Sequence, residues 1–353
     1  MKLRSLRKAL MFLGAMSLSS AALAADWFPL QVSSTDANGQ TTVVEYKGVD
    51  KASKAWKICA AYPHLKDSFW MGANYGMVEE AKRLGLKLQV MDAGGYPNLN
   101  NQISQIENCV AGGADAVILG AVSRDGLNNL LGELKKKNIP VIDIFNGVSS
   151  EDVAAHVLAS PYQEGFNAGQ YLVARHPEGG KKVRVAWLPG PAGAGFVELF
   201  NQGFQAGIKG GAIDIVETKY GDLGREVQAR LIEDVLQTHK DLDYIVGSAV
   251  TAEAGVPVLR SRGLLGKTRL IGLYMTPPVY HGIKQKMVEA SYLEPVVNIA
   301  RISMSEAVKA LEGQPLLRTI VPVGKFYDQS NIDELDTSTA FAPADFRPVF
   351  RVE

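Results

Sequence analysis

Short apolar runs alternate with amphipathic segments along most of this chain. Runs of this kind, bounded by polar or glycine-rich segments, predict buried strands. In the first half, strands are predicted at Ile58–Ala61, Lys87–Met91, Ala116–Leu119, Val141–Ile144 and His156–Ala159. In the second half, they are predicted at Arg184–Leu188, Ile213–Thr218, Tyr244–Gly247 and Arg269–Leu273.

The segments between these runs have the spacing of helices. The clearest are Leu127–Lys137, Gln163–Arg175, Val197–Lys209, Glu226–Lys240 and Ala252–Arg262. Short, almost wholly apolar strands separated by helices are typical of parallel sheets covered on both faces. The predicted fold class is therefore α/β, with two doubly wound parallel-sheet domains in tandem and a cleft between them.

The loop after the first predicted strand carries the most unusual residues of the chain. It holds Tyr62, Asp67, Phe69 and Trp70, aromatic and acidic side chains where a phosphate-binding loop would carry glycines. Ligands of open parallel sheets sit beyond the carboxyl ends of the strands. This loop therefore indicates a site for a small, largely apolar molecule with a polar group.

The first residues have the pattern of a signal peptide. A basic stretch that ends at Lys8 precedes an apolar run, Ala9–Leu18, and a small-x-small cleavage site, Ala22-Leu23-Ala24. The apolar run is too short to cross a membrane. Residues 1–24 are expected to be removed on export, which predicts a periplasmic protein without direct membrane insertion.

Charge and cysteine content narrow the function further. The 353 residues include 37 basic and 37 acidic side chains, so the formal net charge is zero and no basic surface for nucleic acid is indicated. The two cysteines, Cys59 and Cys109, are expected on a strand and on a neighbouring helix. In an oxidising compartment they are a candidate disulfide, with two buried free thiols as the alternative.

No group of residues has the pattern of a catalytic or metal site. The five histidines form no zinc motif, and nucleophile-elbow and Walker patterns are missing from the sequence. The run GPAGAG, Gly190–Gly195, follows a predicted strand but lacks the spacing of a dinucleotide-binding loop. The sequence therefore predicts a protein that is not an enzyme and uses neither cofactor nor metal.

Five runs carry a resemblance to a known family: KAWKICAAYPHLKDSFWMGANYGM, LQVMDAGGY, QIENCVAGGADAVILG, LPGPAGAG and FRPVF. Together, from about Lys54 to Phe350, they resemble the type I periplasmic binding proteins, the ribose-binding and LacI-like group. The resemblance implies two lobes joined by a three-segment hinge, with crossings near Ser160, Leu293 and Val323. The implied parts are an N-terminal extension, 25–54, a first lobe, 55–159 and 294–322, and a second lobe, 160–293 and 323–353.

The first run most resembles the branch of this family that senses trimethylamine N-oxide (TMAO) and regulates a membrane-bound sensor histidine kinase of a two-component system. By position, the resemblance implies ligand contacts from Asp67, Phe69, Trp70, Tyr162 and Tyr274. TMAO carries three methyl groups on a cationic nitrogen and one strongly accepting oxygen. Aromatic faces stabilise such a cation, hydroxyl and indole N–H groups can donate to the oxygen, and Asp67 can offset the charge.

Alternatives remain open for these residues and for the function. Trp70 and Phe69 are also residue types of a packed core, and Asp67 of a helix cap. The same fold serves transport, so the second candidate is a solute-binding component that delivers a sugar or another small molecule to an ABC-type transporter.

Overall fold

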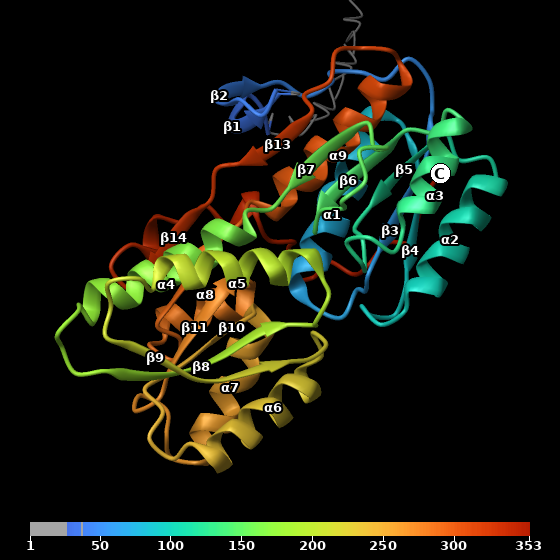
Figure 1. Ribbon diagram of the computed structural model, residues 1–353. Helices are drawn as coiled ribbons and strands as arrows, with labels where there is room; N and C mark the ends of the chain where they lie inside the picture. Colours follow the sequence, from blue (N-terminus) through green and yellow to red (C-terminus); the bar gives the residue numbers. More distant parts are fainter. Residues whose placement is uncertain (1–26, 37) are drawn as a thin grey trace, which may run out of the picture.

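The computed structural model describes residues 27–36 and 38–353, so the predicted signal peptide lies outside the described residues. The described strands form two sheets, one in each lobe (Figure 1). The first sheet has the strand order β15-β4-β3-β5-β6-β7-β13-β1-β2. Its strands are β1 (Leu30–Thr35), β2 (Thr41–Tyr46), β3 (Lys57–Tyr62), β4 (Lys87–Asp92), β5 (Ala116–Leu119), β6 (Val141–Phe145), β7 (Ala155–Leu158), β13 (Thr319–Pro322) and β15 (Arg351–Val352).

The second sheet has the order β14-β12-β11-β10-β8-β9. Its strands are β8 (Val183–Gly190), β9 (Ile213–Tyr220), β10 (Tyr244–Gly247), β11 (Arg269–Tyr274), β12 (Ala290–Leu293) and β14 (Lys325–Asp328). All neighbours in this sheet pair in parallel except β14, which is antiparallel to β12. The predicted class, two doubly wound domains with parallel sheets, is confirmed.

Helices cover both faces of each sheet. In the first lobe, α1 (Ser68–Leu84) and α9 (Val296–Leu311) pack on one face, and α2 (Leu99–Ala111) and α3 (Asn128–Lys136) on the other. In the second lobe, α4 (Pro161–Arg175) and α5 (Gly195–Gly207) lie on one face, opposite α6 (Arg225–Thr238), α7 (Ala249–Ser261) and α8 (Pro277–Lys284). Burial from both sides explains strands as apolar as Ala116–Leu119, in which every residue is buried.

The chain passes from one sheet to the other four times, three times near the places that the sequence indicated and once more after β14. It leaves the first sheet after Leu158, returns after Leu293, and crosses again between Pro322 and Lys325. These crossings bring α9 and β13 to the first lobe and β14 to the second (Figure 1). Ser160 and Glu294 therefore lie on neighbouring hinge segments.

The C-terminal segment differs from the predicted boundary, which assigned residues 323–353 to the second lobe. After β14 the chain returns to the first lobe, where β15 pairs antiparallel with β4. Asn74 on α1 fixes this return, because its side chain donates to the Val349 carbonyl at 2.9 Å and accepts from the Val349 amide at 2.8 Å. The segment thereby covers an edge strand whose backbone groups would otherwise be unpaired.

A disulfide joins Cys59 on β3 to Cys109 on α2, with their Cα atoms 6.5 Å apart. Both cysteines are buried, and the crosslink ties an inner strand of the first sheet to a covering helix. Of the two alternatives that the sequence left open, the structure has the disulfide.

Glycines allow α4 and α5 to approach closely. Gly165 and Gly169 on α4 face Gly203 and Gly207 on α5, and a Cβ built at Gly165 would lie 2.5 Å from the Phe200 carbonyl oxygen. Backbone therefore packs directly on backbone. This contact fixes the helix that carries Glu164 relative to the helix that carries Phe200, and both residues line the site described next.

Candidate ligand site

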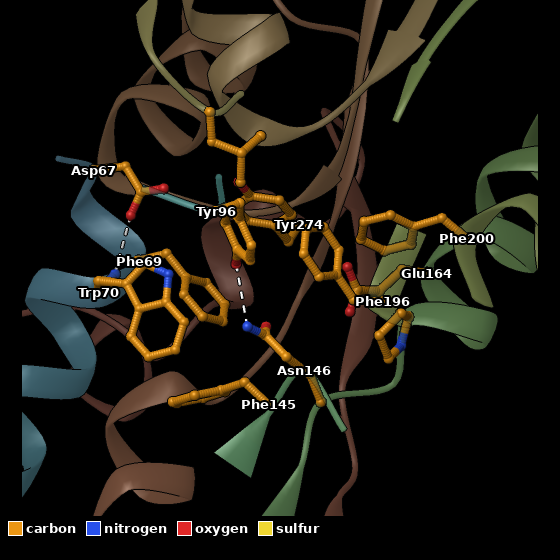
Figure 2. A pocket seen from close by; sticks show the side chains of 13 residues that line it. Asp67, Phe69, Trp70, Tyr96, Phe145, Asn146, Glu164, Phe196, Phe200 and Tyr274 are labelled. Atoms are coloured by element: carbon orange, nitrogen blue, oxygen red, sulfur yellow. Dashed lines mark hydrogen bonds between the residues drawn. The ribbon is translucent and has the colours of Figure 1, made fainter. Parts of the chain in front are cut away.

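A cavity lies where the two lobes meet, at the carboxyl ends of their parallel strands, as expected for this type of sheet. Its residues come from both lobes, mostly from the first turns of helices and the loops that follow strands (Figure 2). They are Asp67, Phe69, Trp70, Tyr96, Phe145, Asn146, Ala159, Pro161, Glu164, Phe196, Phe200, Leu223 and Tyr274.

The cavity is small. The space that the centre of a water molecule can occupy is about 30 Å³. By this measure a single water molecule needs about 10–15 Å³, so the free space is narrow. The size therefore favours a small, rounded ligand in this closed arrangement.

Aromatic rings from the two lobes contact each other around the cavity. Phe69 of the first lobe meets Tyr274 of the second, with ring centroids 5.2 Å apart. Tyr96 meets Phe196 across the same boundary at 5.4 Å. The aromatic enclosure is therefore complete only when the lobes are closed.

Trp70 and Phe145 form the floor of the enclosure, with ring centroids 5.3 Å apart. Trp70 is 1% exposed and also packs on Tyr62. Phe145 ends β6 with a φ of 59°, the left-handed region that a bulky residue rarely adopts. Such strain is typical of functional sites, and here it accompanies a ring that lines the cavity.

Asp67 caps a helix and also lines the cavity. Its Oδ1 accepts from the Trp70 amide at 3.1 Å, which caps α1. Its Oδ2 is buried and has no hydrogen-bond partner among the described residues. Burial raises the pKa of Asp67. A buried carboxyl oxygen without a donor costs free energy that capping the helix does not explain, and a ligand in the cavity can contact this oxygen.

Two tyrosine hydroxyls provide donors. Asn146 donates from Nδ2 to the Tyr96 hydroxyl at 3.2 Å and to the Ala121 carbonyl at 2.7 Å, which leaves the Tyr96 O–H free to donate elsewhere. Burial raises the pKa of both Tyr96 and Tyr274 above the usual tyrosine value. Both hydroxyls therefore stay protonated at neutral pH and can serve a strong acceptor.

The structure brings four of the five predicted ligand residues to the cavity: Asp67, Phe69, Trp70 and Tyr274. It does not bring Tyr162, whose side chain is 38% exposed and stacks on Phe166 along the outer face of α4. The reason is local. The helix begins at Pro161 rather than at Gln163, so Pro161 and Glu164, three residues apart, share the face toward the cavity.

The sequence reasoning missed Tyr96, Phe145, Asn146, Glu164, Phe196 and Phe200. A usable signal existed for part of this set. Phe145 and Asn146 stand at the end of a predicted strand, where ligand contacts gather. A proline directly after Ser160 indicates the first turn of a helix. A helix that begins there places Glu164, rather than Tyr162, on the same face as Pro161.

A model of the periplasmic binding protein domain matches residues 58–315, and the chain belongs to that family. It is a family of binding proteins rather than of enzymes. Among curated proteins, the chain is 34% identical to the periplasmic protein TorT of Escherichia coli K12 over 303 residues, 85% of this chain and 86% of that protein. The predicted resemblance to the TMAO-sensing branch is thereby confirmed at the level of sequence.

Two solved structures are similar throughout. One is an ABC transporter solute-binding protein from Bradyrhizobium sp. BTAi1 with bound bis-Tris, 48% identical, with a TM-score of 0.79, covering 92% of this chain and 99% of that one. The other is the complex of TorT with the TorS sensor domain in the presence of TMAO, 34% identical, with a TM-score of 0.75, covering 84% and 99%.

No helix in residues 27–36 and 38–353 is long and apolar enough to cross a membrane. Within the same residues, no three histidine, cysteine or acidic side chains come together in a group that could hold a metal ion.

Proposed function

We propose that this periplasmic protein binds TMAO in the cavity between its lobes and regulates a membrane-bound, TorS-like sensor histidine kinase. The observation that carries the proposal is the enclosure itself, a small cavity walled by aromatic rings of both lobes and containing hydroxyl donors and buried carboxyl groups. The similarity to TorT over 85% of the chain supports the same ligand and partner.

The chemistry of the cavity matches both ends of TMAO. The faces of Trp70, Tyr96 and Tyr274 suit a cationic nitrogen that carries methyl groups, because each ring face has negative charge density. One such cation–π contact stabilises the bound cation by about 0.5–2 kcal/mol. The N-oxide oxygen needs donors, and the hydroxyls of the two tyrosines are available. The free oxygen of Asp67 can offset the positive nitrogen when ionised.

Closure of the lobes links binding to signalling. Because contacts such as Phe69 to Tyr274 join the lobes around the cavity, a ligand inside it stabilises the closed arrangement over an open one. A kinase sensor domain that distinguishes the two arrangements then reports the ligand. Catalysis has no part in this mechanism.

The second candidate is the solute-binding component of an ABC-type transporter. It is favoured by the 48% identity to the Bradyrhizobium protein, which is described as such a component. The ligand held in that structure, bis-Tris, is a tertiary amine, so it too has a nitrogen with three carbon substituents. A transport role would therefore leave the chemistry of the cavity unchanged and alter only the partner.

Calorimetric titration of the mature protein with TMAO, ribose and tert-butanol tests the ligand. Tert-butanol has nearly the shape of TMAO but lacks its separated charges. We expect TMAO to bind with an affinity at least about tenfold above tert-butanol, the equivalent of one cation–π contact, and ribose not to bind. Binding of ribose with no heat from TMAO would contradict the proposal and favour the transport of sugars.

A further inference from the structure

Two buried carboxyl groups meet at the hinge. Glu164 lies in the first turn of α4 and Glu294 follows β12, and the two side chains are 2% and 1% exposed. The Ser160 N–H that donates to Glu294 lies one helical turn before Glu164, and the charges of the two carboxyl groups act on each other. In each, Oε2 is buried without a donor among the described residues. Two carboxylate ions so placed would repel each other in a medium that solvates neither.

No basic side chain of the described residues compensates this charge. Ser160 donates its backbone N–H to Glu294 Oε1 at 2.7 Å. The other groups that face the pair are the neutral tyrosines Tyr274 on β11 and Tyr292 on β12. Burial, above all, raises the pKa of both carboxyl groups, that of Glu294 to about 7. One proton held between the two oxygens relieves the repulsion.

The position of the pair connects the hinge to the ligand. Ser160 belongs to the first crossing between the lobes and Glu294 to the second, so their hydrogen bond joins two hinge segments. Glu164, the other member, lines the cavity (Figure 2). The pair thus connects the cavity to both hinge segments.

We propose that Glu164 and Glu294 hold one proton between them, and that Glu164 turns this proton to the oxygen of the bound ligand, so that the affinity for the ligand depends on its presence. The inference rests on the proposed function for the identity of the ligand. No covalent bond changes. The proton stays on Glu164, its acceptor changes from Glu294 to the N-oxide oxygen, and Glu294 keeps the Ser160 N–H.

The sign of the pH dependence follows from the charges. As long as Glu164 is protonated, it can donate to the ligand; burial raises its pKa well above the usual range of a glutamate. As the pH rises, the proton is lost and a second negative charge faces the anionic oxygen of the ligand. Because burial raises the pKa of Glu294 to about 7, the folded chain holds a proton there more tightly than the unfolded chain, and the stability linked to that proton is lost as the pH rises through about 7.

Titrations with TMAO from about pH 6 to about pH 9 test the proposal. For the wild type we expect the affinity to fall roughly tenfold per pH unit above the titration of the pair. Glu164→Gln supplies a permanent amide donor, so its affinity should stay constant over this range. Glu198→Gln is the matched control, because Glu198 is exposed on α5 two residues from Phe196 and undergoes the same replacement outside the pair. Glu198→Gln should follow the wild type.

A wild-type affinity that is constant with pH, or the same slope in Glu164→Gln as in the wild type, would overturn the proposal. Infrared spectroscopy of the ligand-free protein at about pH 6 supplies the second readout. The carbonyl band of a protonated carboxyl group should be present in the wild type and lost in the Glu164→Gln, Glu294→Gln double variant. TMAO that fails to bind at every pH refutes the proposed function and the role toward the ligand, whereas a missing band refutes the shared proton itself.

Discussion

Replacing Trp70 with alanine is expected to lower the free energy of unfolding by about 3–5 kcal/mol and to abolish binding of TMAO. The side chain is 1% exposed and lies between Tyr62 and Phe145. It also fits against Gly120 so closely that a Cβ there would lie 2.4 Å from the indole Cη2. Its removal leaves a hole in the core and takes away one wall of the cavity.

The two effects of Trp70→Ala are separated with Trp187→Ala. Trp187 is 2% exposed, stacks on Phe204 in the second lobe and does not line the cavity. Denaturant unfolding should show a comparable loss of stability in both variants, whereas calorimetry below their unfolding temperatures should detect TMAO binding only in Trp187→Ala. Wild-type affinity in Trp70→Ala would mean that Trp70 serves the core alone.

Removal of the disulfide is the second change with a large expected effect. The bond closes a loop between positions that are 50 residues apart. In the chain-entropy account, loss of this crosslink raises the conformational entropy of the unfolded state, which lowers the free energy of unfolding by about 4 kcal/mol. The double variant Cys59→Ser, Cys109→Ser should therefore unfold at a clearly lower denaturant concentration than the wild type.

Reducing agent provides the control for this prediction within the same experiment. It should lower the unfolding midpoint of the wild type toward that of the double variant and leave the double variant unchanged. Because Cys59 lies on β3, the strand that leads into the loop of Asp67, weaker TMAO binding should accompany the loss of stability. A midpoint of the wild type that does not respond to reduction would contradict the structural role of the bond.

The sequence was sufficient for the alternation of strands and helices, because strands buried on both faces have a distinct composition. Val141–Phe145 and Tyr244–Gly247 are buried at every position, and both were predicted to within a residue. It was also sufficient for the first site loop, where Asp67 and Trp70 stand out in type and place. The composition of a segment reports its burial directly.

Contacts between distant segments could not be predicted in this way. Glu164 and Glu294 are separated by almost the whole second lobe, and only the return of the chain through the hinge brings their carboxyl groups together. The two-residue strand β15 likewise has too short a pattern to indicate that it returns to the first lobe. Hydrophobic periodicity assigns a residue to a face of its own element, not to a partner in another one.

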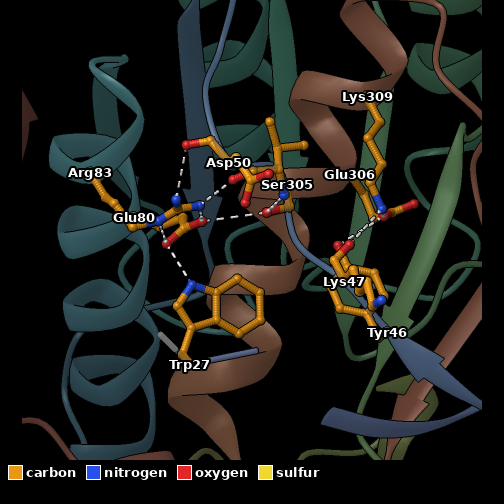
Figure 3. Close-up of polar contacts among 10 residues, drawn as sticks. Trp27, Tyr46, Lys47, Asp50, Glu80, Arg83, Ser305, Glu306 and Lys309 are labelled. Atoms are coloured by element: carbon orange, nitrogen blue, oxygen red, sulfur yellow. Dashed lines mark hydrogen bonds and ion pairs between the residues drawn. The ribbon is translucent and has the colours of Figure 1, made fainter. Parts of the chain in front are cut away.

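The N-terminal extension, predicted as a separate segment without assigned contacts, shows the same limit. Its strands β1 and β2 extend the first sheet beyond β13. Figure 3 shows how buried carboxyl groups of the first lobe hold it: the Trp27 indole donates to Glu80 at 2.9 Å, and the Tyr46 hydroxyl donates to Glu306 at 2.9 Å. Lys309 also donates to Glu306, at 2.8 Å, so the buried charge is paired.

The central claim is that a small methylated amine oxide closes the lobes and that a kinase reads the closed arrangement. Titration of TMAO into the mature protein, alone and in complex with the sensor domain of the TorS-like kinase from the same organism, tests it most directly. By linkage, the sensor domain should change the affinity for TMAO by the same factor by which TMAO changes the affinity for the sensor domain. A factor of about 5–150 is typical of such coupling. Equal TMAO affinity with and without the sensor domain would contradict the account.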